Sequence, residues 1–216
     1  MQIAVVLYDR FTALDAVGPY EVLSRMPGAE LTFVAAQAGP VRADTDRLAL
    51  TADAAFEELA APDVVVVPGG PGQMERMDDE RLLSWLRAAD AATTWTTSVC
   101  TGSLLLAAAG LLDGRRATTH WLLMDELERH GATAASERVV TDGKYVTAAG
   151  VSAGIDMALT LAATVAGDDL AQTAQLLLEY DPQPPFDAGS PAKAPAQLVT
   201  ALREVSRAAQ PQGHAP

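Results

Sequence analysis

Two short, nearly uninterrupted aliphatic runs constrain the fold of this chain most strongly. They are Ile3–Leu7 (IAVVL) and Asp63–Val67 (DVVVV). Such runs are typical of strands that are buried on both faces in a parallel sheet. After a loop, each run is followed by a segment with helical spacing, Leu14–Met26 and Asp79–Ala91. This alternation predicts an α/β fold with a mostly parallel sheet.

The rest of the chain continues the alternation and shows no internal repeat, low-complexity block or linker. We therefore expect one domain over residues 1–216, with residues 210–216 as a disordered tail. The proline-rich segment Asp181–Pro195 predicts an irregular loop. The other expected elements are strands at Leu31–Ala36, Thr93–Val99 and Arg115–Thr119, a hairpin or edge strand at Val41–Leu50, a hairpin around Asp142-Gly143, and helices at Leu104–Ala109, Leu122–His130, Ala153–Ala166, Asp168–Leu178 and Gln197–Ala209.

Charge and cysteine content limit the partners that we expect. The 216 residues carry a formal net charge of −13, which argues against a nucleic-acid partner and against an anionic membrane surface. The N-terminus, MQIAVVLYDRF, lacks the features of a signal peptide, and no apolar run is long enough to cross a bilayer. With a single cysteine there is no internal disulfide. We expect a cytoplasmic protein.

The single cysteine, Cys100, lies where the Thr93–Val99 strand ends and a helix begins. A thiol at a helix start is favoured as thiolate, the nucleophilic form, by the unpaired N–H groups and the helix dipole. This pattern indicates a nucleophile elbow. The alternative is a small apolar residue at the end of a buried strand, because free cysteine is among the most buried residue types.

Asp15 lies between apolar neighbours at the start of the first expected helix. In one interpretation it caps the helix or stabilises its first turn by about 1 kcal/mol. In the other it is a buried carboxylate near Cys100 that transfers protons. The local pattern alone favours the first interpretation.

A third feature is the turn Pro68-Gly69-Gly70-Pro71-Gly72, directly after the second aliphatic run. It lacks the GxxxxGK[ST] pattern and a nearby lysine, so it predicts an oxyanion hole or a purely structural turn rather than a nucleotide loop. This turn, the Cys100 turn and the loop before Asp15 all lie at the carboxyl ends of parallel strands, where such sheets bind ligands. Their convergence favours the nucleophile interpretation of Cys100.

These residues resemble the ThiJ/PfpI superfamily, a flavodoxin-like three-layer sandwich related to class I glutamine amidotransferases. The resemblance covers nearly the whole chain, and three blocks are similar to its isocyanide hydratase branch. The general motifs are Pro68-Gly69-Gly70, SVCTG at Ser98–Gly102 and ATTHW at Ala117–Trp121, and the blocks of the branch are Leu14–Pro19, Val99–Trp121 and Leu178–Pro191. The same blocks recur in AraC-type regulators with a further DNA-binding domain, for which we expect no room here.

The resemblance implies a role for several residues. Cys100 matches the nucleophile of the elbow and Asp15 the acid that faces it. Gly70 and Thr101 match the two backbone N–H positions that line the anion pocket. Protease-like members carry a histidine where this chain has Thr101, which argues against peptidase activity.

Three further residues are candidates for a supporting role at the site: Gly69, His120 and Tyr180. His120 either orients groups around the cysteine or caps the helix that starts at Trp121. Tyr180 either reaches a neighbouring pocket with its hydroxyl or is a core aromatic residue. Three histidines and one cysteine show no metal-ligand spacing, so we expect neither a metal nor another cofactor.

The resemblance implies that isocyanides are hydrated to N-substituted formamides through a thioimidate on Cys100, with Asp15 as general acid and base. It also implies a homodimer acting on a small molecule. Two alternatives stay open. One is a glyoxalase-like or deglycase-like thiol enzyme that uses the same cysteine and acid. The other is a non-enzymatic domain that senses redox state or a ligand through Cys100.

Overall fold

The structure is a computed structural model that describes residues 1–209, so the predicted tail at residues 210–216 lies outside the described residues. Contacts divide the chain into two units, Met1–Glu179 and a second unit that begins at Tyr180. We describe each unit by itself, and the expectation of one domain over the whole chain stays a prediction.

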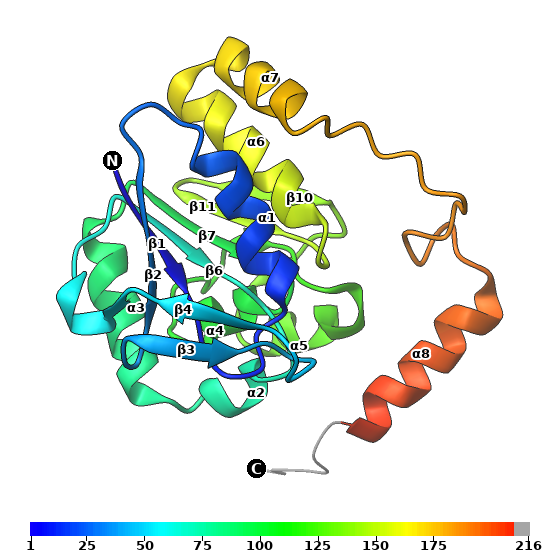
Figure 1. Cartoon of the computed structure of the whole chain (residues 1–216). Coiled ribbons are helices and arrows are strands. Elements are labelled where there is room, and N and C mark those ends of the chain that lie inside the picture. The colour runs from blue at the N-terminus through cyan, green and yellow to red at the C-terminus, as the bar shows by residue number, and fades with distance from the viewer. Residues whose placement is uncertain (210–216) are drawn as a thin grey trace. The chain divides into compact units, whose positions relative to one another are not determined.

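A seven-stranded sheet forms the centre of the first unit, with the strand order β10-β11-β7-β6-β1-β2-β5 (Figure 1). All neighbouring strands are parallel except β10 and β11, which form the predicted antiparallel hairpin. The aliphatic runs form β1 and β6 in the middle of the sheet, and both are buried as predicted. The strands are β1 (Gln2–Val6), β2 (Glu30–Ala35), β5 (Ala54–Ala55), β6 (Val64–Val67), β7 (Trp95–Val99), β10 (Val139–Asp142) and β11 (Tyr145–Ala148).

Helices cover both faces of this sheet. Figure 1 shows α1 (Ala13–Leu23) and α6 (Ala153–Ala166) on one face, where they pack against each other. On the other face α3 (Glu80–Ala92) packs against α4 (Gly102–Ala108). Helix α7 (Asp168–Leu177) packs on α6. The predicted α/β sandwich with a mostly parallel sheet is therefore confirmed.

The smaller elements differ most from the predictions. The expected strand Arg115–Thr119 is reduced to β8 (Arg116–Ala117), because Thr118 N–H donates to Thr147 Oγ1 at 2.9 Å and leaves the ladder. The expected helix Leu122–His130 is divided into the short helix η2 (Trp121–Leu123) and α5 (Met124–Arg129). The remaining elements of the first unit are β3 (Gly39–Arg42) and β4 (Ala49–Ala52), which pair as the predicted hairpin, with η1 (Phe56–Glu58), α2 (Gln73–Arg76) and β9 (Thr133–Ala134).

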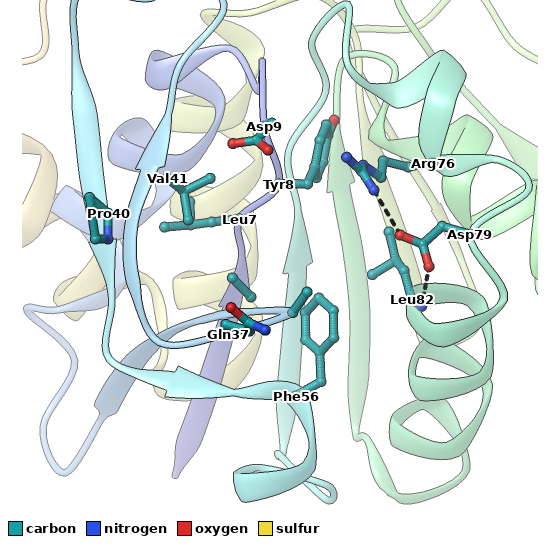
Figure 2. Close-up of a pocket in the computed structure, with 12 residues that line it drawn as sticks. Leu7, Tyr8, Asp9, Gln37, Pro40, Val41, Phe56, Arg76, Asp79 and Leu82 are labelled. Carbon is teal, nitrogen blue, oxygen red and sulfur yellow. Dashed lines mark hydrogen bonds and ion pairs between the residues drawn. The ribbon is translucent and has the colours of Figure 1, made fainter.

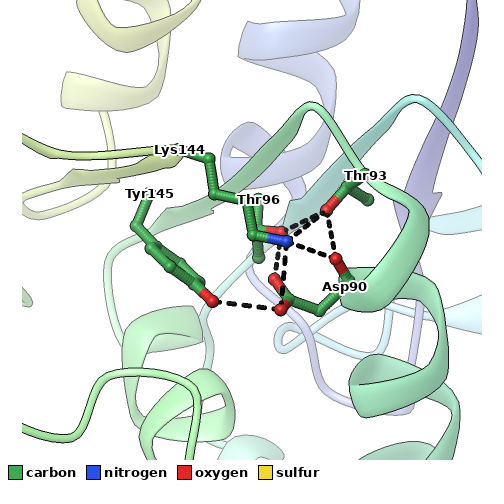
Figure 3. A network of polar contacts seen from close by, with 5 residues as sticks. All are labelled: Asp90, Thr93, Thr96, Lys144 and Tyr145. Carbon is green, nitrogen blue, oxygen red and sulfur yellow. Dashed lines mark hydrogen bonds and ion pairs between the residues drawn. The ribbon is translucent and has the colours of Figure 1, made fainter.

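A buried polar network closes the edge of the sheet where β7 and β11 begin (Figure 3). The Asp90 carboxylate accepts from Thr96 Oγ1 at 2.6 Å and from the Tyr145 hydroxyl at 3.0 Å, and it pairs with Lys144 Nζ at 3.1 Å. Thr93 Oγ1 bonds the Asp90 carbonyl at 3.1 Å. Because both carboxylate oxygens are satisfied, the network anchors α3 to two strands.

The second unit consists of an irregular segment, as predicted for Asp181–Pro195, followed by α8 (Ala196–Ala209). Leu198, Leu202 and Val205 recur at helical spacing on α8 and are 52%, 51% and 66% exposed. Within residues 1–209, none of the helices combines the length and the apolar character that crossing a membrane requires.

Candidate active site

Cys100 occupies the sharp turn between β7 and α4, at the carboxyl edge of the sheet. Its φ of 56° lies in the left-handed region, which residues other than glycine seldom adopt. Hydrogen bonds hold this conformation: Cys100 N–H donates to Ala148 O at 3.0 Å and Ala149 O at 3.1 Å. The Cys100 carbonyl accepts from Ser103 Oγ at 3.2 Å and Thr119 Oγ1 at 3.0 Å. The turn is therefore a fixed elbow, as predicted.

The glycine turn after β6 presses directly against this elbow. A Cβ on Gly69 would lie 2.4 Å from Thr101 N and 2.9 Å from Cys100 Cβ, so only glycine fits there. Gly69 N–H donates to Asp15 Oδ2 at 2.9 Å, and Gly70 N–H donates to Thr101 Oγ1 at 2.9 Å. The turn thus joins the acid on α1 to the elbow.

Asp15 lies in the first turn of α1 and is fully buried. It does not cap the helix: Thr12 is the N-cap residue, and the Asp15 carboxylate accepts from Gly69 instead of a helix amide. The carboxyl also interacts with the Cys100 thiol. Oδ1 has no partner with standard hydrogen-bond geometry among the described residues. Asp15 is therefore not the helix cap, although it is an acidic residue of the first turn, as the same interpretation allows.

Of the two apolar chain neighbours of Asp15, Ala16 is fully buried, whereas Leu14 is 42% exposed. The buried site itself raises the pKa of Asp15 from 3.8 to about 7, mainly because burial disfavours the charged carboxylate. The Gly69 N–H bond lowers this pKa in part.

The surroundings of Cys100 oppose the thiolate that a helix start is expected to favour. Burial raises the pKa of the thiol to about 12, and the Asp15 carboxylate raises it further as a neighbouring negative charge. The backbone N–H groups of Val151 and Thr101 oppose this shift by bonding the sulfur. The effect of burial on the thiol pKa is larger than that of the helix N-terminus. Cys100 and Asp15 together therefore hold one proton above about pH 7.

Two backbone N–H groups bond the Cys100 sulfur, and only one of them belongs to a residue that the resemblance implies. Thr101 N–H contacts the thiol as the resemblance implies, whereas Gly70 N–H is engaged by Thr101 Oγ1. Val151, with a φ of 29°, supplies the second N–H. The sequence gives a single signal for Val151, its place between a strand end and the start of α6. The anion-pocket role implied for Gly70 stays a prediction.

His120 caps the short helix η2, as one of the two interpretations of this residue predicts. Its Nδ1 accepts from Leu122 N–H at 3.4 Å, and burial lowers the pKa of the ring. The imidazole also packs against Gly150, where a Cβ would lie 2.6 Å from His120 Cδ2. His120 therefore lies beside the backbone that leads to Val151.

Tyr8 belongs to the site although nothing in the sequence pattern singled it out. Its ring is 5% exposed, and its hydroxyl donates to Pro68 O at 2.8 Å. Burial raises the pKa of Tyr8 well above 10.0, and the neighbouring charge of Asp15 raises it further. Tyr180, by contrast, begins the second unit, so its supporting role stays a prediction.

The site holds no evident metal-binding group. Over residues 1–209, no three histidine, cysteine, aspartate or glutamate side chains gather closely enough to hold a metal ion. What the arrangement offers is a thiol, a buried carboxyl of raised pKa and two amide donors. This set is suited to nucleophilic catalysis with proton transfer.

Comparison with known proteins settles the family. The model of the DJ-1/PfpI family matches residues 1–164. The chain belongs to the DJ-1/PfpI family. A crystal structure of a ThiJ/PfpI family protein from Pseudomonas syringae superposes with a TM-score of 0.93 and 40% identity, covering 96% of this chain and 86% of that one.

The curated proteins that this chain matches include an enzyme and a transcriptional regulator. The chain is 46% identical to isonitrile hydratase from Pseudomonas putida over 204 residues, which is 94% of this chain and 89% of that protein. It is 35% identical to the HTH-type transcriptional regulator CdhR from Pseudomonas aeruginosa, over 73% of this chain but 48% of the regulator. The similarity to the hydratase thus extends over nearly the full length of both proteins.

Proposed function

We propose that this protein is an isocyanide hydratase, which converts isocyanides and water to N-substituted formamides. The observation that carries the proposal is the 46% identity to isonitrile hydratase over 94% of the chain. The site supports it, because the reaction needs a nucleophile and a proton donor at the same carbon. Cys100 and Asp15 are the pair that we assign to these roles.

In the first step, the Cys100 sulfur attacks the terminal carbon of the isocyanide. The Asp15 carboxylate removes the thiol proton during the attack and delivers it to the same carbon. A C–S bond and a C–H bond form while one carbon–nitrogen π bond breaks, and the product is a thioimidate. A carboxyl with a pKa of about 7 suits this task, because it can both accept and donate a proton near neutral pH.

In the second step, water adds to the thioimidate carbon. Asp15 takes a proton from the water and passes it to the substrate nitrogen, which gives a tetrahedral intermediate. Asp15 then removes the hydroxyl proton as the C–S bond breaks, and it returns that proton to the sulfur. The N–H groups of Val151 and Thr101 stabilise the charge on sulfur as it leaves.

A hydratase and the two alternatives predict different outcomes with an isocyanide, with methylglyoxal and with peroxide. The wild-type protein should form N-phenylformamide from phenyl isocyanide and leave methylglyoxal unchanged. Turnover of methylglyoxal without hydration of the isocyanide would favour the glyoxalase-like enzyme. A protein that turns over neither compound, while mild peroxide oxidises Cys100 to a sulfinic acid, would favour the sensing domain.

The protein is further proposed to be a homodimer acting on a small molecule. The apolar side chains of α8 support an association, since a helix of 14 residues is marginal in water without a surface to pack on. The Leu178–Pro191 segment is the part of the chain that we propose for the shared face.

A further inference from the structure

The β3–β4 hairpin lies against the segment that joins β1 to α1. Its Ala43 forms an isolated parallel bridge with Phe11 of that segment. Val41 of β3 and Leu7, which follows β1, are both buried and line a second cavity of about 310 Å³, where Figure 2 shows both side chains. The hairpin is therefore fixed in place at the carboxyl end of β1.

Asp44, in the turn of this hairpin, makes two hydrogen bonds to the same segment. Its backbone N–H donates to Phe11 O at 2.9 Å, and its carboxylate accepts from the Thr12 hydroxyl at 2.8 Å. Thr12 is the N-cap residue of α1, a position at which a threonine hydroxyl usually accepts from a helix amide. The Thr12 hydroxyl makes no such bond to the helix and donates to Asp44 instead. The bond therefore joins the hairpin to the start of α1.

The backbone of Thr12 connects this bond to the active site. Thr12 N–H donates to Gly69 O at 2.8 Å, and Thr12 O accepts from Asp15 N–H at 3.0 Å. Gly69 N–H donates to Asp15 Oδ2 at 2.9 Å, which closes the ring of hydrogen bonds. A Cβ on Gly70 would lie 2.4 Å from Thr12 N, so the glycine turn and Thr12 are in close contact. A shift of Thr12 would therefore move the Asp15 carboxyl relative to the Cys100 thiol.

Asp44 also acts on the site through its charge. The titratable groups that interact with Asp15 come from three other parts of the fold: Cys100 at the elbow, Tyr8 just after β1 and Asp44 in the hairpin. Burial is the main cause of the raised pKa of Asp15, and the negative charge of Asp44 raises it further. Asp44 is half-buried, whereas Tyr8 and Cys100 are buried, so its charge can be removed without altering the core.

We propose that Asp44 is a positioning residue for the Cys100–Asp15 pair, which holds the start of α1 against the glycine turn through the Thr12 hydroxyl. It acts through Thr12 and Gly69 rather than on the reacting atoms. The proposal rests on the proposed function where turnover is measured, whereas the reactivity of Cys100 toward iodoacetamide tests it without that function.

The hydrogen bond between Thr12 and Asp44 can be removed from either side. Thr12→Val and Asp44→Ala should each lower kcat for phenyl isocyanide about tenfold. The double variant should lose no more than either single variant, because both remove the same bond. Asp44→Asn should keep kcat within about twofold of the wild-type value, since its side-chain oxygen still accepts from Thr12. Full activity of both single variants, or a double loss that equals the product of the single losses, would overturn the proposal.

Alkylation of Cys100 by iodoacetamide reports on the same pair of groups. In the wild-type protein the rate should rise with pH and level off at about pH 7, where Asp15 ionises. Thr12→Val should lower the level rate about tenfold, as it does for turnover. In Asp44→Asn the rate should level off about half a pH unit lower, because a neighbouring negative charge is lost.

Asp46→Asn is the matched control for charge. Asp46 is an exposed residue of the same turn, and asparagine tolerates its φ of 57°. This variant should leave the alkylation profile unchanged. Alkylation of Thr12→Val at the wild-type rate, or a profile that Asp44→Asn and Asp46→Asn move equally, would overturn the proposal. The expected alkylation results in a protein that hydrates no isocyanide would support the role of Asp44 and contradict only the proposed function.

Discussion

At the scale of single residues, the chemistry depends on one proton shared by two buried groups. The fully buried carboxyl of Asp15 accepts from Gly69 and interacts with the Cys100 thiol. Burial raises the pKa of both groups, to about 7 and about 12. The form of the pair that holds one proton is the one that can attack an isocyanide and protonate it in the same step.

The pH dependence of kcat/KM should therefore report the ionisation of Asp15. Below about pH 7 the pair takes up a second proton, so no base is left to accept the thiol proton. We expect kcat/KM to rise tenfold per pH unit up to about pH 7 and to stay level to pH 9. A stopped-flow profile that is flat between pH 5 and pH 9 would argue against Asp15 as the base.

The raised pKa of Asp15 also means that its ionisation destabilises the folded protein. The variant Asp15→Asn should reveal this effect. Because the folded-state pKa is raised from 3.8 to about 7, ionisation destabilises the fold progressively between these pH values and fully above them. We expect Asp15→Asn to raise the free energy of unfolding by about 1–3 kcal/mol at pH 8 and little at pH 4. Urea unfolding at the two pH values measures this. An equal effect at both would show that ionisation is not its source.

At the scale of elements, one turn holds the site together at the carboxyl ends of the strands. Gly69 and Gly70 after β6 hold Asp15 and Thr101, and the Tyr8 hydroxyl holds the preceding residue, Pro68. Tyr8 is thus a positioning residue that acts through the turn rather than on the substrate.

Tyr8→Phe removes the bond to Pro68 and keeps the ring. A bond of this kind contributes about 1 kcal/mol, so we expect kcat to fall about three- to tenfold while KM changes little. The pH profile of kcat/KM in Tyr8→Phe should show no fall below pH 9, as in the wild-type protein. Tyr20→Phe is the matched control, because its ring stacks on Phe33 at 5.4 Å, away from the turn. Equal losses in both variants would mean that Tyr8 acts only through general stability.

The buried strands and the elbow were predictable from sequence because periodicity and turn chemistry are local. The aliphatic runs became β1 and β6, and Cys100 lies at the turn between β7 and α4. Tyr8 and Val151 were not predictable as parts of the site, because only the packed sheet brings them to the elbow. The four-residue helix α2 is too short for a periodic signal, although its Arg76 lines the second cavity.

The pKa of Cys100 shows where local reasoning gives the wrong sign. A helix start alone predicts a thiolate. The folded chain buries the thiol beside a carboxylate, and desolvation is the larger effect. Asp15 does not cap the helix for the same reason, since its partner Gly69 is 54 residues away in the chain.

At the scale of the whole molecule, the amino and carboxyl ends of the sheet strands differ in how well their polar groups are satisfied. The edge where β7 and β11 begin is closed by the satisfied network around Asp90 (Figure 3). The opposite ends of the strands carry the strained elbow and an unsatisfied Asp15 oxygen. This division places strain and an unpaired group at the carboxyl ends of the strands, where parallel sheets bind ligands.

Assembly is the prediction that belongs to the molecule as a whole. We expect light scattering after size exclusion to give twice the chain mass of 22.6 kDa. A chain ending at Glu179 should lose this association, because it lacks most of the proposed Leu178–Pro191 face as well as the apolar side chains of α8. A wild-type protein that is monomeric at micromolar concentration would contradict the homodimer.

The central claim is that Cys100 attacks the isocyanide carbon, and intact-protein mass spectrometry after rapid acid quenching tests it most directly. During turnover of phenyl isocyanide, the account predicts one adduct of the substrate mass on the wild-type chain, located at Cys100 by peptide mapping. Cys100→Ala should carry no adduct and form no formamide above the uncatalysed rate. Formamide production by Cys100→Ala at the wild-type rate would contradict the account.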